Sequence, residues 1–206
     1  MNPINKLTEY FAEFPGIGPR QAKRFVYFLL TRNQSHIDEI AKLLGTLKSQ
    51  VHICSSCFRF FQSENREVTL CDICSNRNRD NALLVIVARD VDLENIERAH
   101  VHTGKYFVLG GGVPILEKEP EKRIRSKELI RIVRARGEKQ ELKEIILALN
   151  ATPEGENTSA YLESFLQDTT TELNIKVSHL GRGISTGTEL EYSDADTIKN
   201  ALNNRN

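Results

Sequence analysis

The chain has 206 residues, of which 39% are hydrophobic and 27% charged, and 28 basic residues balance 28 acidic ones to a formal net charge of zero. This composition supports a packed core plus one or two small modules, and it lacks the overall positive charge of many nucleic-acid-binding proteins. The longest apolar run, residues 82–88, is too short to span a membrane, and the first residues lack the features of a secretory signal, so we expect a cytoplasmic protein.

Residues 3–50 are predicted to be helical, because apolar residues recur at helical spacing and a Pro-Gly pair interrupts them at positions 15–16. The stretch "FAEFPGIGPRQAKRF" resembles a helix-hairpin-helix motif, in which a turn and the following helix N-terminus present backbone N–H groups to a phosphate. Such contacts carry no sequence information. The residues expected to contact DNA are Gly16, Gly18, Arg20, Lys23 and Arg24. There are two alternatives to DNA binding for this stretch: an ordinary helical hairpin with solvated cations, and a contact between copies of the chain.

All four cysteines lie between positions 54 and 74, in two Cys-x-x-Cys pairs separated by thirteen residues. Two such pairs complete the tetrahedral ligand set of a structural zinc ion. The surrounding segment has few large apolar residues, so metal binding would supply the missing folding free energy. We expect one structural Zn²⁺ per chain, held by Cys54, Cys57, Cys71 and Cys74. Two disulfides or four free thiols are the alternatives, and a cytoplasmic chain disfavours disulfides.

From residue 82 the sequence alternates between stretches typical of buried strands and stretches typical of helices. Strands are predicted at 82–88, 106–112, 143–150 and 175–180, and helices at 92–100, 126–137 and 159–169. This alternation predicts an α/β domain with a mostly parallel, doubly wound sheet. Ligand sites on such sheets lie at the carboxyl ends of the strands.

The stretch "ALNATPEGEN" occupies that position at the end of the third predicted strand. It reads as a strand, a turn at Pro153, and two carboxylates, Glu154 and Glu156. Acidic groups at the end of a strand are typical of divalent metal sites. The stretch is therefore either such a site or its remnant.

Charge is unevenly distributed along the chain. Residues 122–136 contain seven basic residues against one acid, Glu128, whereas Glu189, Glu191, Asp194 and Asp196 make the C-terminal stretch acidic. A neutral chain with segregated charge can still present a basic face to phosphates or use opposite faces to self-associate. The basic run is thus a second candidate for DNA contact, although a solvated helix face is the more ordinary interpretation.

The order of a helix-hairpin-helix, a four-cysteine zinc module and an α/β domain ending its third strand in "ALNATPEGE" resembles the bacterial RecR family of recombination mediators. The stretches "TPEGENTSAYL" and "LGRGISTGTELEYSDADTIKNAL" carry the resemblance further along the chain. It implies an α+β multidomain fold: residues 1–50 form the DNA-binding and oligomerisation region, 51–78 the zinc module, 79–180 a Toprim domain and 181–206 an oligomerisation arm.

The resemblance also implies a function. RecR-type proteins act with RecO, and often RecF, to help load RecA onto single-stranded DNA covered by SSB during recombinational repair. They associate into dimers or ring-like tetramers. The implied partners are therefore DNA of either strandedness without sequence preference, RecO or RecF, and further copies of the chain, with no membrane contact.

Toprim enzymes hold Mg²⁺ with a glutamate at the end of the first strand and an Asp-x-Asp pair at a later one. In this sequence Ala88 takes the place of the glutamate, and Asn150 and Thr152 take the places of the aspartates. Asp90 and Asp92 follow too far beyond the strand to replace the glutamate simply. We therefore expect no phosphodiester chemistry and interpret Glu154 and Glu156 as a docking surface for a basic protein partner such as RecO. A Mg²⁺-dependent Toprim nuclease and a zinc-stapled module unrelated to DNA are the alternatives.

Overall fold

The computed structural model describes residues 2–65, 67–181, 183–184, 187 and 189–203. The chain forms two compact units, one up to Val51 and one from His52 onward. No helix within the described residues is long and apolar enough to cross a membrane.

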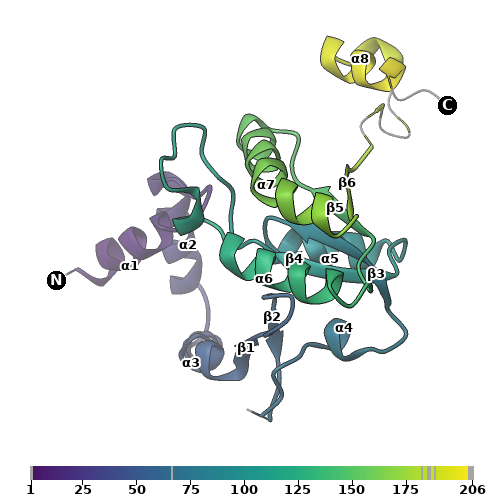
Figure 1. Ribbon diagram of the computed structural model, residues 1–206. Helices are drawn as coiled ribbons and strands as arrows, with labels where there is room; N and C mark the ends of the chain where they lie inside the picture. Colours follow the sequence, from purple (N-terminus) through teal and green to yellow (C-terminus); the bar gives the residue numbers. More distant parts are fainter. Residues whose placement is uncertain (1, 66, 182, 185–186, 188, 204–206) are drawn as a thin grey trace. The chain divides into compact units, whose positions relative to one another are not determined.

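The first unit is helical, as the sequence predicts. Its helices are α1 (Pro3–Ala12), α2 (Pro19–Leu30) and α3 (Gln34–Gln50) (Figure 1). Phe11 of α1 holds the first two helices together, because its ring lies 6.2 Å from that of Phe25 in α2, measured between centroids. Ala22 and Val26 are the buried residues of α2, and they lie four positions apart on one face.

The second unit begins with the cysteine-containing segment. In it β1 (Val51–Ile53) pairs with β2 (Phe60–Gln62), and the short helix α4 (Asp72–Ser75) follows.

The sheet of this unit confirms the predicted parallel α/β architecture. Within the described residues, β3 (Asp80–Val87), β4 (Gly104–Val108), β5 (Glu144–Ala148) and β6 (Lys176–His179) form a parallel sheet in the order β4-β3-β5-β6. Val87 pairs with Val108 on one side and with Ala148 on the other. The residues that follow these three strands therefore meet at one edge of the sheet.

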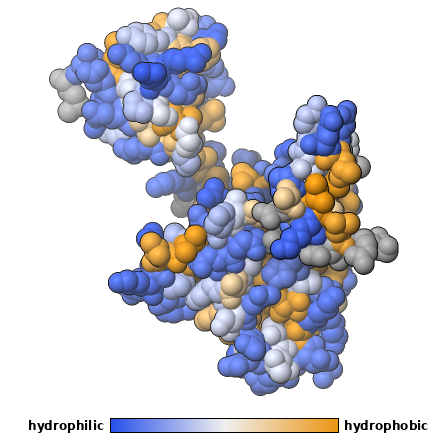
Figure 2. Space-filling view, turned by 90° about the horizontal axis from the view of Figure 1, so that it is seen from above, coloured by the Kyte–Doolittle hydropathy of each residue, from blue (hydrophilic) through white to orange (hydrophobic). Residues whose placement is uncertain are grey.

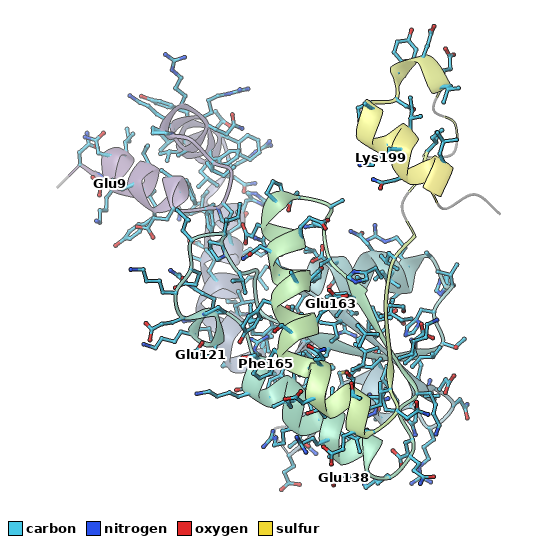
Figure 3. All side chains as sticks on the ribbon, turned by 45° about the horizontal axis from the view of Figure 1, so that its top comes forward. Glu9, Glu121, Glu138, Glu163, Phe165 and Lys199 are labelled. Atoms are coloured by element: carbon cyan, nitrogen blue, oxygen red, sulfur yellow. The ribbon has the colours of Figure 1, made fainter. Side chains whose placement is uncertain are left out.

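Three helices connect the strands: α5 (Asp90–Arg98), α6 (Ser126–Gly137) and α7 (Pro153–Glu172) (Figure 1). One face of the sheet packs against α6 and α7, in a core that includes Leu84, Ile86, Phe107, Leu129 and Leu162. The helix α7 is amphipathic: Glu163, labelled in Figure 3, is exposed, whereas the neighbouring Leu162 is buried.

The opposite face of the sheet packs against α5 and the cysteine-containing segment. Val85, Val87 and Val108 share a buried cluster with Leu93 of α5 and with three of the cysteines. Three of the four cysteines thus lie inside the core of the second unit.

The C-terminal stretch contains a 3₁₀ turn (Leu190–Tyr192) and α8 (Ala195–Asn203). Positions 182, 185–186, 188 and 204–206 of the predicted oligomerisation arm lie outside the described residues.

Figure 2 shows apolar side chains at the surface among hydrophilic ones. In the first unit these exposed residues include Leu7, Tyr10, Phe14, Tyr27, Phe28, Leu30, Leu43, Leu44 and Leu47.

Candidate functional site

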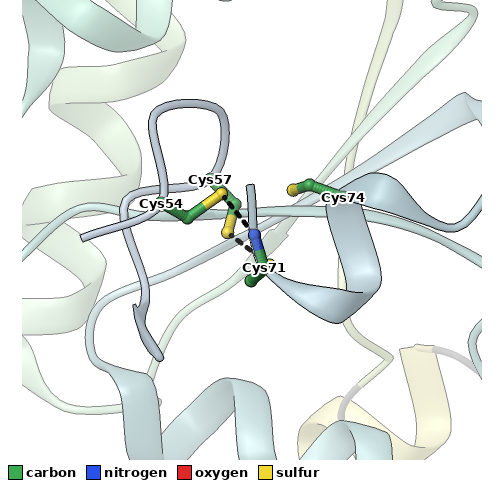
Figure 4. A group of neighbouring side chains, drawn as sticks. All are labelled: Cys54, Cys57, Cys71 and Cys74. Carbon is green, nitrogen blue, oxygen red and sulfur yellow. Dashed lines mark hydrogen bonds between the residues drawn. The ribbon is translucent and has the colours of Figure 1, made fainter. Parts of the chain in front are cut away.

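The four cysteines meet at one point, as their spacing predicts. Their sulfur atoms all lie within 4.8 Å of one another, and they form the one group of three or more His, Cys, Asp or Glu side chains in the described part of the chain that could hold a metal ion. Cys54, Cys57 and Cys71 are buried and Cys74 is partly exposed. The Cys71 N–H donates to the sulfur of Cys54 at 3.4 Å, and the sulfurs of Cys57 and Cys71 lie 3.6 Å apart. Figure 4 marks these contacts with dashed lines. Four convergent sulfurs fit a tetrahedral metal ion.

The thiols perturb one another's ionisation strongly. Hydrogen bonding with Cys57, and then with Cys71 and Cys74, lowers the pKa of Cys54, and the hydrogen bond to Cys54 raises the pKa of Cys57. A thiolate is the form that binds metal. Metal binding requires the thiols to lose their protons, and a bound cation would compensate the resulting negative charge.

The first cysteine pair is fixed to the edge strand β4. The Val108 N–H donates to the Cys57 carbonyl at 2.8 Å, which continues the hydrogen bonding of β4 into the cysteine segment. Phe58 adopts a left-handed backbone conformation with φ of 61°, and its ring lies 5.4 Å from that of Phe107 in the core. The Arg125 guanidinium lies over the Phe58 ring, 5.7 Å from the ring centroid.

The second pair is fixed to the same strand by Lys105. The Lys105 ammonium donates to the carbonyls of Ile73, Cys74 and Asn76 at 2.9, 3.2 and 2.8 Å. These carbonyls surround the C-terminal end of α4, where a cation is favourable. Sequence reasoning missed Lys105, because nothing local to it signals a contact about thirty residues away.

The turn between α1 and α2 has the geometry expected of the hairpin. Gly16 has φ of +77°, which favours glycine. Gly18 is the N-cap of α2 without a side-chain hydrogen bond, and Pro19 is the first helical residue. The first N–H groups of a helix have no partner inside it. This helix start is therefore available to a phosphate.

The basic residues of α2 are presented to solvent. Arg20, Lys23 and Arg24 are all exposed, and no salt bridge in the described part of the chain involves them. Among the residues that the structure describes, Arg24 donates only to the side chain of Gln21, at 3.4 Å. Their charges therefore remain available to an external anion.

At the carboxyl edge of the sheet, a pocket of about 170 Å³ is lined by Ala88, Arg89, Gly112, Leu149, Asn150, Thr152, Glu154, Gly155 and Thr158. This is where the sheet topology predicts a ligand site. The described part of the chain brings no cluster of three acidic groups together here.

The predicted turn at Pro153 is wrong, because Pro153 is the first residue of α7. Thr152 is its N-cap, with the hydroxyl accepting the Gly155 N–H at 3.2 Å. Proline at this position starts a helix well, since its missing N–H costs nothing there. Gly155 is required by packing: a Cβ would lie 1.9 Å from the Asn150 carbonyl oxygen.

Both glutamates of this stretch are exposed on the first turn of α7, but they face different hollows. Glu154 lines the pocket beside Ala88, whereas Glu156 lines a second hollow with Glu163 and His179. Residues two apart on a helix do not share a face. A partner that contacts both carboxylates must therefore wrap the start of α7.

Asp90 and Asp92 stabilise the start of α5. The Asp90 carboxylate accepts the Phe60 N–H at 2.7 Å, and the Asp92 carboxylate accepts the Arg89 N–H at 3.0 Å. Both acids are used by the fold, and neither replaces the absent glutamate at Ala88.

Most of the basic run 122–136 is also used by the fold. Arg123 pairs with Glu117 and Lys122 with Glu119. Arg125 donates to the Val108 carbonyl, and Arg136 donates to the Asn81 carbonyl. Arg134 forms a salt bridge with Glu172. Lys127 and Arg131 remain exposed on α6. The run is thus a weaker candidate for DNA contact than its charge indicates.

Comparison with known families agrees with this architecture. Residues 4–47 match the helix-hairpin-helix of RecR, residues 82–181 a Toprim domain, and residues 183–206 the C-terminal region of RecR. The recombination protein RecR of Prochlorococcus marinus is 36% identical over 98% of this chain and 95% of its own length. Those of Dehalococcoides mccartyi and Lactobacillus acidophilus are 34% and 32% identical over 98% of this chain, and over 93% and 96% of their own lengths.

Proposed function

The chain belongs to the RecR family of recombination proteins, and from this premise we propose that it is a non-enzymatic DNA-binding mediator of recombinational repair. It acts with RecO, and with RecF as a second proposed partner, to help load RecA onto single-stranded DNA covered by SSB. The observation that carries the proposal is the uncapped start of α2 beside Arg20, Lys23 and Arg24, all exposed and without salt bridges in the described part of the chain.

These groups suit the DNA backbone. Gly18 brings no side chain between the helix N-terminus and an approaching phosphate, and a Cβ on Gly16 or Gly18 would meet nothing within 4 Å. Arg20 and Arg24, one turn apart, add charge on one face. One hairpin offers few contacts, so we propose that self-association multiplies them. The exposed leucines of the first unit support such association: Leu7, Leu30, Leu43, Leu44 and Leu47.

The cysteine cluster is proposed to hold one structural Zn²⁺. Zinc prefers a closed tetrahedral set of four thiolates in structural sites. The site leaves no position for a substrate, because all four donors come from the protein and three are buried. Its role is to hold the cysteine segment against β4.

We propose no phosphodiester chemistry at the carboxyl edge of the sheet. Such chemistry needs several carboxylates to hold Mg²⁺ and move a proton. Here Ala88, Asn150 and Thr152 supply none, and Asp90 is engaged by the Phe60 backbone.

The DNA assignment is tested by replacing Arg20 and Arg24 with alanine together. Binding of a labelled single strand and of a duplex should both weaken, because charge is lost at the backbone contact. Lys127→Ala with Arg131→Ala is the matched control, since it removes two exposed cations one turn apart on α6. Unchanged binding by the α2 variant, or equal loss in the control, would contradict the assignment.

The partner proposal has its own test. Glu154→Ala with Glu156→Ala should lose RecO in a pull-down while circular dichroism and DNA binding stay unchanged. Retention of RecO by this variant would remove the start of α7 from the partner surface.

A further inference from the structure

Two neighbouring rows of exposed side chains run along α2, and each row passes from cations to an aromatic ring. One row contains Arg20, Arg24, Phe28 and, just beyond the helix, Arg32; the other contains Lys23, Tyr27 and Thr31. Residues four apart share a helix face and lie about 6 Å apart along the axis. These residues form one continuous strip, the α2 strip.

The rings of the α2 strip do not belong to the core. Tyr27 and Phe28 are 51% and 49% exposed. The helix buries a different face through Ala22 and Val26, and Phe25 contacts the ring of Phe11. The two adjacent, half-exposed rings are therefore accessible to a ligand from outside the unit.

The charge of the α2 strip identifies what that occupant must be. Its four cations, Arg20, Lys23, Arg24 and Arg32, form no salt bridge within the described residues. The occupant must therefore carry several negative charges and also offer flat apolar groups to the rings. A single strand of nucleic acid offers both, since its phosphates are charged and its bases are unpaired.

The C-terminal end of the strip has room for a base. The Arg32 guanidinium lies over the Phe28 ring, 4.0 Å from the ring centroid. A hollow of about 560 Å³ beside this pair is lined by Phe28, Thr31, Arg32, Asn33 and His36. Guanidinium planes and aromatic rings are the surfaces on which proteins stack unpaired bases.

We propose that the α2 strip binds single-stranded DNA through both parts of the nucleotide: its cations hold phosphates, and Tyr27 and Phe28 stack on bases. The inference rests on the proposed DNA-binding function and deepens it by naming the preferred substrate. The bases of a duplex already stack on one another, so the rings add nothing to duplex binding. The strip therefore favours single strands over duplex.

The test removes the rings from the full-length protein and the bases from the DNA in parallel. One variant carries Tyr27→Leu and Phe28→Leu, which keeps apolar bulk and helix propensity. A second carries Tyr27→Phe and Phe28→Tyr, which keeps both rings. Each is titrated with labelled oligothymidylate, with an abasic oligonucleotide of the same length, and with a duplex, and its mass in solution is measured.

The leucine variant should bind oligothymidylate about tenfold more weakly, because stacking is lost, while its binding to the abasic strand and the duplex stays unchanged. The ring-exchanged variant should bind all three as the original chain does. Three results for the leucine variant would each overturn the stacking role. Its affinity for the abasic strand or the duplex could fall as much as its affinity for oligothymidylate, or its affinity for oligothymidylate could stay unchanged. Its mass in solution could also fall enough to explain the lower affinity. A failure of the DNA-binding function itself would appear differently, as absence of duplex and abasic binding in the original chain.

Discussion

Gly18 is a residue that neither its backbone angles nor its surroundings require to be glycine. Its φ of −81° suits any residue, and a Cβ there would meet no atom within 4 Å. Gly16 differs, because its φ of +77° favours glycine. Glycine is one of the residues preferred at an N-cap, and the proposed phosphate contact gives a second reason for it, since glycine leaves the helix start open.

Gly18→Ser separates stability from binding. Serine is a good N-cap, so the variant should be as stable as the original chain or more stable by roughly a few tenths of a kcal/mol, whereas DNA affinity should fall because the side chain obstructs the helix start. Thermal unfolding and a DNA titration measure the two effects. Gly45→Ser in α3, which has equally open surroundings, should leave DNA affinity unchanged; a loss there, or none in Gly18→Ser, contradicts the account.

Glu97 gives the second unit a defined response to acid. Burial raises the pKa of Glu97, but the interactions with Arg79, Tyr106 and His102 together outweigh burial and hold that pKa below its ordinary value. Arg79 also donates to the carbonyls of His102 and Gly104. The pair thus joins α5 to the start of β4.

Because the folded pKa of Glu97 is lowered, its stabilisation is complete above the unfolded pKa of about 4.3 and is lost as pH falls through the folded value. Glu97→Gln should lower the free energy of unfolding at neutral pH by roughly 1.5–3 kcal/mol and flatten its decline below pH ~4. Urea unfolding across pH measures both. The exposed Glu94→Gln on the same helix should change neither; an unaltered acid slope in Glu97→Gln would refute the linkage.

Single residues also show how far the sequence could be interpreted. The helix start at Pro19 is predictable because two glycines precede it, whereas the turn predicted at Pro153 is wrong. Thr152 before it and Glu154 after it are the signals of an N-cap and an acidic first turn that identify a helix there. The absence of carboxylates at Ala88, Asn150 and Thr152 was visible from the sequence alone.

Among the structural elements, the cysteine segment and β4 depend on each other. β4 is an edge strand, and the segment covers it through the Cys57 carbonyl, the Phe58 ring and the contacts of Lys105. Unpaired edges invite association with other strands. The proposed zinc ion therefore protects the sheet as well as folding its own segment.

Lys105→Met tests this coupling. The outer-shell contact to the second cysteine pair is lost, so zinc affinity should fall roughly 10- to 100-fold, measured by competition with a chromophoric chelator. Lys143→Met, an exposed lysine before β5, should retain the original affinity. Equal zinc affinity in the Lys105 variant would show that the lysine holds only the protein scaffold.

Contacts between residues far apart in the sequence are the part of the fold that the sequence could not predict. Strands and helices follow from local apolar periodicity, and their parallel order follows from alternation. The partners of Lys105 and Arg136 are 29 or more residues away, and local patterns carry no information at that distance. For this reason the sequence alone indicates a candidate DNA surface at residues 122–136. In the structure, five of the seven basic residues of this run have partners within the fold.

For the whole molecule, we propose that the two compact units have separate roles. The first unit is proposed to contact DNA through α2, whereas the second contains a Toprim domain without carboxylates at Ala88, Asn150 and Thr152. Glu154 and Glu156, exposed at the start of α7, are proposed to contact a partner. Holding DNA through several weak hairpins requires several copies of the chain, so the affinity of the assembly should exceed that of any single hairpin.

The measurement that tests this central claim most directly is the salt dependence of binding to single-stranded DNA. Each phosphate contact contributes about 0.7 to the slope of log affinity against log salt concentration. Arg20→Ala with Arg24→Ala should therefore reduce the slope by about 1.4 for each engaged hairpin, whereas Lys127→Ala with Arg131→Ala should leave it unchanged. A slope that is the same in the α2 variant and the original chain would contradict the claim that this protein holds DNA through α2.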